Sequence, residues 1–494
     1  MASETVNNIT TGTTGITTEQ PDAVAIMDNS MRQWHTDSLL PKTLLGGTSA
    51  MKGAGKVFLP DHTLESDTSY NSRLDASTLL NIYRKTTSFL TGQVFQSDIV
   101  MKDGIDPIFT EWGMAIDTSG NDMNVFCKRN FFNGVSKGMS YILIDMPKKD
   151  DSIQTVADEK NAGIRPYFKE INTDDMLGGI IDDSGFIVQL RIKETSLVRI
   201  GRFGYKRVKR VRVLEPGKWE LHEEDNTTYT LIDSGTFSVN IIPVTVFIPG
   251  EEISQLIGET PLMDLAELNG KHWRSSSNQD NYLAYCRFPL YFGKHLDLAV
   301  LPMGRALINS EEDSADLKVV EMTGSSIAAG LQDIKETEAQ MALYGLQQLI
   351  PRTGSMTATE KALTSAESNS SLGTWATEFE SILIQSFKIA ASFVGKEFPD
   401  DGLTVNKEYN FGVADPAELN AILKANEQGI LSAQACFTEF RRRGVFQEHL
   451  SWDDMEDDME QEKQDSIDMA RMAGAAFGDA PGDGEAEGDN EEDV

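Results

Sequence analysis

The stretch Pro261-Leu-Met-Asp-Leu-Ala-Glu-Leu-Asn269 opens a long helical pattern that decides the architecture of this chain. Proline suits the first turn of a helix, where its missing N–H has no partner in any case, and the pattern continues to Tyr285. At about 1.5 Å per residue this helix spans roughly 37 Å, and its polar middle gives it little to bury. Helices of this kind pack against copies of themselves or line something, so the sequence predicts an assembly rather than a pocket.

Two more long helices follow, after a strand-like insert at 286–326. Apolar residues recur at near-helical spacing over 327–350, which predicts the second helix. The break Pro351-Arg-Thr-Gly354 separates it from a third helix over 357–394, which reaches up to roughly 57 Å. The insert holds three candidate strands, which are Leu290-Tyr-Phe292, Ala306-Leu-Ile308 and Leu317-Lys-Val-Val320.

The regions on either side of these helices predict a mixed α+β chain. Residues 1–54 are rich in Thr and Gly without periodicity, so we expect an irregular N-terminal arm. Helical patterns cover 66–96 and 121–134, and two more helices are expected within 416–444, where Asp415 is a candidate N-cap and Pro416 suits the first turn. Strands are predicted by β-branched, turn-bounded runs at 141–144, 186–192, 208–214, 229–232, 242–248 and 403–411.

The net charge is −33 over 494 residues, and it is concentrated at the C-terminus. From Ser451 to Val494 there are 17 acidic residues against Lys463 and Arg471. Such a segment cannot bury enough apolar surface to offset its ordering entropy, so we expect a disordered acidic tail over 451–494. The rest of the chain is also acidic, which argues against a tight, static nucleic-acid binder but not against a protein that DNA slides past.

Cysteine usage and hydropathy predict a protein made in the cytoplasm. Cys127, Cys286 and Cys436 lie far apart, so neither a disulfide framework nor a zinc site is indicated. No run of about 18 apolar residues occurs, and the first 20 residues do not read as a signal peptide, so we expect no membrane span.

No motif in the sequence supports an enzyme, a cofactor or a metal site. Gly53-Ala-Gly-Lys56 lacks both the earlier glycine and the following Ser or Thr of a phosphate-binding loop. The six histidines never fall at metal-ligand spacing, and the carboxylates occur in solvated runs rather than as an isolated acid–base pair. We therefore expect a non-enzymatic protein.

One basic run, from Arg202 to Arg212, has two interpretations. It can contact nucleic acid, or it can be a strand whose Val208, Val211 and Val213 face a core while acidic residues neutralise its charges. We favour the strand, with Glu220, Glu223 and Glu224 as the neutralising residues.

With these pieces in place, the chain resembles the portal (head-to-tail connector) proteins of tailed bacteriophages over roughly residues 55–445. The order and spacing of several blocks carry the resemblance. The blocks are Phe58-Leu-Pro60, Glu65-Ser-Asp67, Tyr70, Arg73-Leu74, Leu80-Asn81, Pro261-Leu-Met-Asp-Leu-Ala-Glu-Leu-Asn269, Thr357-Ala-Thr-Glu360 and Ser365-Ala-Glu-Ser-Asn-Ser-Ser-Leu-Gly373.

The resemblance implies the phage portal fold, assembled as a ring that is usually dodecameric. By analogy, the wing comprises 55–259 with a long helix and strand at 357–412, and the stem helices are 260–285 and 327–350. The clip is 286–326, the crown is 413–450, and 351–356 is a tunnel loop that projects into the channel.

The resemblance also implies function, partners and place. The ring would conduct double-stranded DNA during genome packaging and ejection at one capsid vertex of the virion. Its partners would be the major capsid protein, scaffold, the terminase large subunit and a head-completion or tail adaptor protein. The expected channel residues are Arg352, Thr353 and Ser355 of the loop, with Lys335 and Lys361.

Two alternatives remain open from the sequence. One is another virion structural protein, such as a connector or adaptor ring without a tunnel function. The other is a metal-dependent hydrolase whose site is built from scattered Asp and Glu residues.

Overall fold

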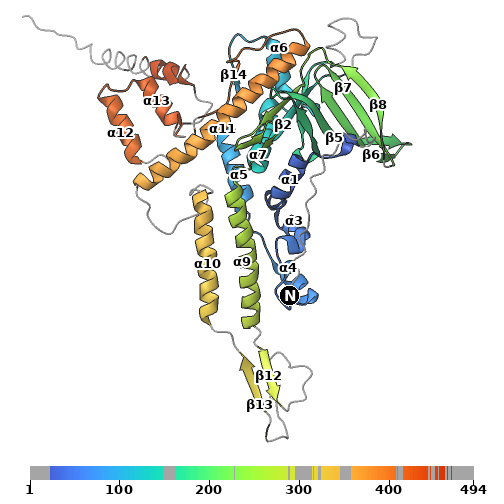
Figure 1. Ribbon diagram of the computed structural model, residues 1–494. Coiled ribbons are helices and arrows are strands. Elements are labelled where there is room, and N and C mark those ends of the chain that lie inside the picture. Colours follow the sequence, from blue (N-terminus) through green and yellow to red (C-terminus); the bar gives the residue numbers. More distant parts are fainter. Residues whose placement is uncertain are drawn as a thin grey trace, which may run out of the picture. The chain divides into compact units, whose positions relative to one another are not determined.

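The computed structural model is mixed α/β and divides into two compact units, Met1–Tyr409 and Asn410–Val494 (Figure 1). The structure describes residues 23–147, 163–226, 228–287, 290–294, 314, 316–320, 324–344, 358–407, 409, 416–442, 445–446, 451–453, 455–461, 464 and 469. The predicted strand at 306–308, the loop at 351–356 and most of the acidic tail therefore lie outside the described residues.

Residues 23–54 correct the expectation of an irregular arm, and the first 22 residues of that arm lie outside the described residues. After a short turn of 3-10 helix, η1 (Ala23–Ala25), the chain forms α1 (Asn29–Asp37), α2 (Leu39–Leu45) and α3 (Gly47–Ala54). Helices of this length are marginal on their own, so tertiary packing has to hold them. Each buries side chains in a core, namely Met31, Trp34, Leu44 and Met51.

The next described helices of the first unit are α4 to α7. The predicted pattern at 66–96 is two helices, α4 (Asp67–Ala76) and α5 (Ile82–Val94), which begin at the N-caps Ser66 and Asn81. The prediction at 121–134 is confirmed as α7 (Met123–Lys137). The prediction missed α6 (Pro107–Met114), although Asp106 accepts a hydrogen bond from Ile108 N as an N-cap and Pro107 opens the helix.

The strands form two main antiparallel sheets. The first has the order β3-β2-β9, with β3 (Tyr167–Ile171), β2 (Ser140–Asp145) and β9 (Val244–Phe247). The second runs β4-β5-β6-β7-β8 in chain order. Its strands are β4 (Met176–Ile181), β5 (Ile187–Ile200), β6 (Gly204–Glu215), β7 (Lys218–Asp225) and β8 (Thr228–Thr236).

Five predicted strands are thereby confirmed as β2, β5, β6, β8 and β9, while β3, β4 and β7 were missed. Two small antiparallel pairs complete the described strands of this unit apart from the insert: β1 (Val100–Met101) with β14 (Leu403–Thr404), and β10 (Glu252–Ser254) with β11 (Ile257–Gly258). The strand predicted at 403–411 is therefore only two residues long in its described part.

The long helices match the prediction closely. They are α9 (Met263–Arg287), α10 (Gly324–Tyr344) and α11 (Ala358–Phe393), of 25, 21 and 36 residues. Between α9 and α10 the antiparallel pair β12 (Leu290–Lys294) and β13 (Asp316–Val320) confirms two of the three strands predicted in the insert.

An aromatic core surrounds the C-terminal half of α11. Phe379 of α11 lies 5.5 Å from Phe131 of α7 and 5.0 Å from Phe247 of β9, measured between ring centroids. A glycine permits this packing, because a Cβ at Gly134 would lie 2.4 Å from the Phe247 ring. The helix α11 therefore covers the β3-β2-β9 sheet on the side that α7 also contacts.

The second unit contains α12 (Pro416–Glu427) and α13 (Ala433–Arg442), as the sequence predicted for 416–444. An aromatic cluster of Phe437, Phe440, Phe446 and Trp452 forms beside α13. Among the residues that the structure describes, none of the helices is long and apolar enough to cross a membrane.

Candidate functional site

The helices α9 and α10 form an antiparallel hairpin with polar contacts along its length. Asp333 accepts hydrogen bonds from Lys271 Nζ and Ser275 Oγ, each at 3.0 Å, and both bonds lower the pKa of its carboxyl. One level further along, His272 Nε2 lies 3.3 Å from Glu338 Oε1. The hairpin is thus held by polar and charged side chains, and the charges of Lys271 and Asp333 are matched within the pair of helices.

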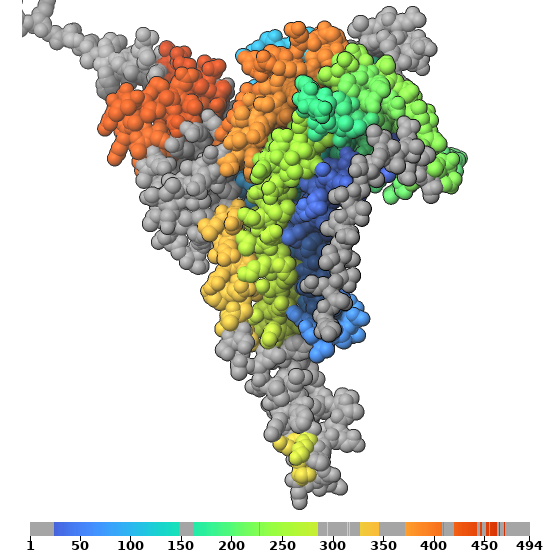
Figure 2. Space-filling view, in the orientation of Figure 1, coloured from blue at the N-terminus to red at the C-terminus, as the bar shows by residue number. Residues whose placement is uncertain are grey.

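A second face of α9 packs against the N-terminal helices. Leu265, Ala266 and Trp273 are buried with Leu44 of α2 and Tyr83 of α5. Hydrogen bonds fix the same face, because Asn269 Oδ1 accepts from Tyr83 N at 3.0 Å and Asn269 Nδ2 donates to Leu80 O at 2.9 Å. Figure 2 shows α9 exposed along the side that neither α10 nor these helices cover.

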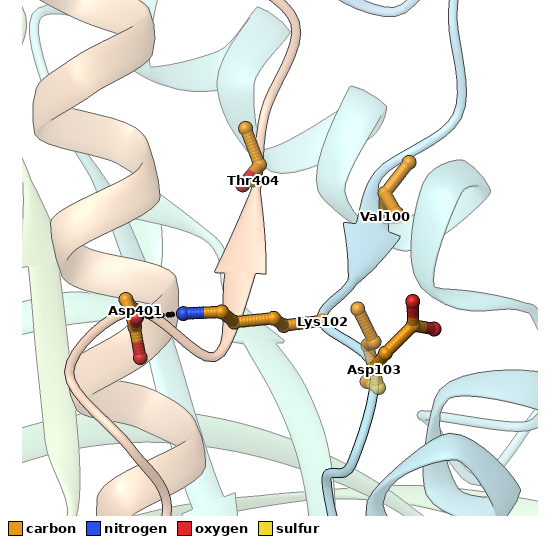
Figure 3. Close-up of a pocket in the computed structure, with 6 residues that line it drawn as sticks. Val100, Lys102, Asp103, Asp401 and Thr404 are labelled. Carbon is orange, nitrogen blue, oxygen red and sulfur yellow. Dashed lines mark hydrogen bonds and ion pairs between the residues drawn. The ribbon is translucent and has the colours of Figure 1, made fainter.

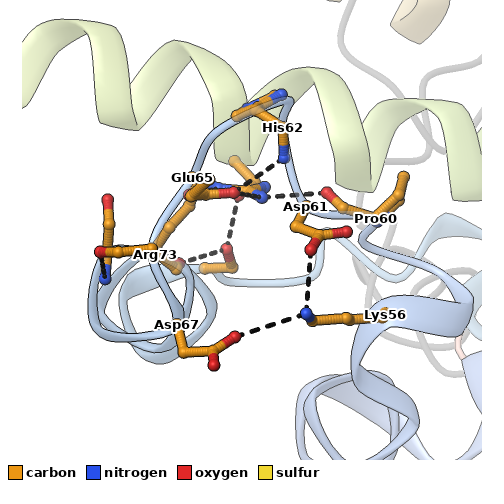
Figure 4. A network of polar contacts seen from close by, with 11 residues as sticks. Lys56, Pro60, Asp61, His62, Glu65, Asp67 and Arg73 are labelled. Atoms are coloured by element: carbon orange, nitrogen blue, oxygen red, sulfur yellow. Dashed lines mark hydrogen bonds and ion pairs between the residues drawn. The ribbon is translucent and has the colours of Figure 1, made fainter.

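A buried ion pair braces the segment that supports α9 (Figure 4). Arg73 of α4 donates to Glu65 through Nε at 2.9 Å and Nη2 at 2.7 Å, and its Nη2 also donates to Pro60 O. The side chains are only 2% and 5% exposed. The Arg73 hydrogen bonds lower the pKa of Glu65 to about 2. Leu59 and Leu74 from the same segment pack into the core that contains Trp273.

The blocks around Pro60, Glu65 and Arg73, which carried part of the family resemblance, therefore have a structural role here. They form the packing and the ion pair that hold α4, and α4 contacts α9. A hydrogen bond at 2.8 Å between Ser77 Oγ and Ser277 Oγ joins the end of α4 to α9 directly.

The free face of α9 carries a stripe of charge. Asp264, Glu267, Lys271 and Arg274 recur at spacings of three and four residues, which places them on one side of the helix. Three of them are exposed and Lys271 is half-buried. Two acids and two bases leave this face without net charge. Arg274 forms no ion pair with any residue that the structure describes, which makes it a candidate contact for an anion.

Sequence reasoning did not single out Arg274, although its spacing from Lys271 gave the signal. Of the five residues that it did name, Lys335 is exposed on α10 and forms no ion pair with a described residue. Its acidic neighbours in the sequence make other contacts, because Glu336 accepts a hydrogen bond from Gln332 at 2.9 Å and Glu338 lies against His272. Lys361 lies in the first turn of α11, and its side chain is outside the described part. Arg352, Thr353 and Ser355 lie outside the described residues altogether.

A shallow pocket lies at the β1–β14 pair (Figure 3). Lys102 and Asp401 form an ion pair at its rim, and Val100, Met101, Asp103 and Thr404 complete the lining. This lining has one cation, which is already paired, and offers no nucleophile beside a base, so we assign it no chemistry. Within the described ranges, no three His, Cys, Asp or Glu side chains gather closely enough to hold a metal ion.

The basic run of β6 is ion-paired in its second half. Arg210 lies opposite Glu223 on β7, with an Nη2–Oε2 distance of 2.8 Å, and Lys209 Nζ lies 3.1 Å from Glu224 Oε1. Arg212 Nε donates to Glu194 Oε1 at 3.0 Å. The predicted neutralisation by Glu223 and Glu224 is therefore confirmed, whereas Glu220 lies against His222 Nε2 at 3.1 Å. Val211 and Val213 face one core, whereas Val208 lies on the other face of the strand, as the two-residue period requires.

Comparison with known proteins gives one family match and a set of distant structures. A family described as "Domain of unknown function (DUF4055)" matches residues 261–394, which covers α9, the insert, α10 and α11. No curated protein matches the sequence.

Solved structures that overlap with the chain include "Virion of native gene transfer agent (GTA) particle", at 10% identity over 71% of this chain and 86% of the other, with a TM-score of 0.35. Another is "Neck of native GTA particle computed with C12 symmetry", at 10% identity over 73% of this chain and 88% of the other, with a TM-score of 0.35.

Proposed function

We propose that this chain is a portal-type subunit, and that copies of it form a ring whose channel conducts double-stranded DNA into and out of a phage-type capsid. The observation that carries the proposal is the α9–α10 hairpin. It joins two long helices through a strand pair, and α9 keeps the charged side chains Asp264, Glu267 and Arg274 exposed. The same order of elements underlies the resemblance to phage portal proteins.

The charge of the hairpin supports a passage rather than a static binding site. Duplex DNA carries one negative charge per about 1.7 Å, so a channel as long as α9 would surround about 20 phosphate charges at once. Ring symmetry multiplies every cation of the wall by the number of subunits. On α9 the stripe of Asp264, Glu267, Lys271 and Arg274 sums to zero, and Lys271 is already paired with Asp333. A wall of this composition holds DNA weakly enough to let it move.

The few unpaired cations would then set the residual grip on DNA. Arg274 and Lys335 are the exposed stem cations that form no ion pair among the described residues. Arg352 and Lys361 are further candidates by their place in the sequence, and Thr353 and Ser355 would accompany Arg352 at the loop. In this proposal the protein is a conduit and no enzyme, and a terminase ATPase that docks on the ring supplies the force. A capsid protein and a tail adaptor would contact the remaining outer surfaces.

Electron microscopy of the purified protein, with mass measured in parallel, tests the ring. Closed rings with a hole wide enough for a DNA duplex are the expected result, either from the chain alone or with scaffold and capsid proteins supplied. A chain that stays monomeric with those partners present would overturn the proposal.

A second experiment separates a portal from a structural adaptor ring. Deleting residues 351–356 removes the loop expected to meet DNA, and Arg352→Ala removes its cation alone. Genome packaging and retention should both fall in a portal. Normal packaging by virions that contain the deleted chain would favour an adaptor ring without a tunnel function.

A further inference from the structure

The hairpin of β5 and β6 extends beyond the rest of its sheet. β5 pairs with β6 from Leu190 and Leu214 as far as Ile200 and Gly204. The strands on either side stop earlier, because β7 pairs with β6 only over 210–215 and β4 pairs with β5 only over 187–192. Residues 197–207 therefore form a two-stranded ribbon that has no neighbouring strand among the described residues, at the end where β5 and β6 meet (Figure 1).

This ribbon exposes large apolar side chains. Phe203 at its turn is 87% exposed. Residues at successive positions of a strand point to opposite faces, so both faces of the ribbon are apolar. An isolated two-stranded ribbon is marginally stable at best in water, and an apolar cluster of this size marks a contact surface. The exposed apolar residues of the ribbon are Leu197, Val198, Ile200, Phe203 and Tyr205.

The same ribbon is basic. It contains Arg199, Arg202, Lys206 and Arg207 and no acidic residue. None of these four forms an ion pair with a described residue, although Arg199 donates to backbone oxygens of its own turn and Arg202 lies over the Phe203 ring. We call residues 197–207 the basic ribbon end.

The opposite end of β5 has the complementary composition. At the turn between β4 and β5, Ile180 and Phe186 are exposed beside Asp182 and Asp183. The β10–β11 hairpin lies against this turn, because the Gln255 side chain donates to Gly185 O. It adds three more exposed residues, Glu251, Glu252 and Ile253. We call residues 180–186 with 251–253 the acidic turn end; neither segment contains Lys or Arg.

We propose that the basic ribbon end of one copy of this chain binds the acidic turn end of the next copy. The two ends lie at opposite termini of a 14-residue strand, which is about 46 Å long. Both are apolar and their charges are opposite, so one copy cannot satisfy both ends by itself. Contact between different patches on identical chains is a head-to-tail interface, which generates a ring when the rotation closes.

A second copy fits these observations better than nucleic acid does. Phosphate contacts would use the four cations but would leave the aliphatic residues Leu197, Val198 and Ile200 in water. The acidic turn end provides apolar partners for them together with the counter-charges. This inference rests on the proposed ring and deepens it, because it names the surfaces through which neighbouring subunits hold each other.

Reciprocal charge reversal in the full chain tests the contact. One variant carries Lys206→Glu with Arg207→Glu, a second carries Asp183→Lys with Glu252→Lys, and a third combines all four changes. Asp182 stays unchanged because its carboxylate accepts hydrogen bonds from Ser184 N and Phe186 N within the turn. The matched control, Lys85→Glu with Lys128→Glu, makes the same change of charge on exposed helical positions elsewhere. Self-association is followed by sedimentation velocity against protein concentration at low and high salt.

Each of the first two variants should raise the concentration needed for half-assembly about tenfold at low salt, and less at high salt. The variant with all four changes should reach half-assembly at a concentration within about threefold of that of the original chain. A merely misfolded variant would not recover in this way. Phe203→Ser should weaken association at both salt concentrations. The control should assemble as the original chain does.

The outcomes separate this inference from the proposed function. Rings that form normally in both single-end variants would overturn the head-to-tail contact and leave the ring intact. Open chains that depend on the two ends but never close would support the contact and overturn the ring. No self-association of the original chain at any concentration, with scaffold and capsid proteins present, would overturn both. Loss of binding to a duplex DNA probe or to anionic vesicles in the basic-end variant, with assembly unchanged, would assign the ribbon to that other occupant instead.

Discussion

Replacing Glu65 with Gln should destabilise the segment that supports α9, because it leaves the Arg73 guanidinium buried without its counter-charge. The pKa of Glu65 falls from 4.5 to about 2 in the folded protein, chiefly through the Arg73 hydrogen bonds. A shift of one pKa unit corresponds to about 1.4 kcal/mol, so this shift contributes about 3 kcal/mol to the free energy of unfolding. The two side chains are 2% and 5% exposed, so water screens the pair little, and removal of one partner of a buried pair costs a similar amount. We expect a loss of about 2–3 kcal/mol.

Hydrogen exchange followed by mass spectrometry measures this loss where it occurs, which matters in a chain with two compact units. Amides of α4 should exchange roughly 30- to 150-fold faster in the Glu65→Gln variant at pH 7. The double variant Glu65→Leu with Arg73→Met is the control, since apolar side chains of similar volume can replace a buried pair at little cost. Unchanged exchange in Glu65→Gln, or an equal loss in the double variant, would refute the reasoning.

The same pair predicts a pH dependence with a definite sign. A carboxyl whose pKa is depressed in the folded state stabilises the protein fully above its unfolded pKa of 4.5, and this contribution is lost as the pH falls toward about 2. Protection of α4 should therefore decline between pH 4.5 and pH 2 in the original chain. The Glu65→Gln variant should lack this part of the decline.

Three further predictions follow from other contacts. Gly134→Ala should lower the free energy of unfolding by about 2–3 kcal/mol, because its Cβ would meet the packed Phe247 ring. Gly92→Ala on α5 has open space and should be neutral or stabilising by up to about 1 kcal/mol. Denaturant unfolding compares the two variants, and equal effects would contradict the packing argument. Burial and the nearby Lys42 lower the pKa of His35 in the folded protein, so stability should fall as the pH drops from 6.5 through that lower pKa. His35→Gln should flatten this dependence of thermal stability on pH. An unchanged dependence would contradict the prediction. Arg274→Gln should reduce the slope of log affinity against log salt concentration when assembled rings bind duplex DNA, while Glu267→Gln should not. Equal slopes in the two variants would contradict the assignment of Arg274 to the channel wall.

The long helices were predictable from the sequence because their signals are local. Pro261 marks the start of the first long helix, and Pro351 and Gly354 mark the break between the second and third. Within each helix the apolar periodicity is sustained. The short N-terminal helices were not predictable. Trp34 and Leu44 look unpatterned in a segment rich in Thr and Gly, and they are helical because distant elements bury them. Tertiary burial thus overrode a weak local signal.

The tunnel loop and the channel cations remain predictions, because four of their five residues lie beyond the described side chains. Lys335 shows the limit of what the sequence predicts about ion pairs in these helices. Its acidic neighbours Glu336 and Glu338 are close enough in sequence to pair with it, yet Glu336 accepts from Gln332 and Glu338 lies against His272 of the facing helix. Only the pairing of α9 with α10, which no local pattern encodes, decides which cation of the stem stays unpaired.

The basic run of β6 makes the same point for a sheet. In the sequence its cations form one cluster that is interpreted as a whole, whereas the strand register divides them. Arg210 lies opposite Glu223, but β7 ends at Asp225, so Lys206 and Arg207 extend past the last acidic neighbour. Because β7 is short, Lys206 and Arg207 have no acidic residue opposite them, and this half of the run remains an unpaired basic surface among the described residues. Lengthening β7 with acidic residues should therefore abolish the charge of the ribbon without touching β6, and with it the head-to-tail attraction proposed above.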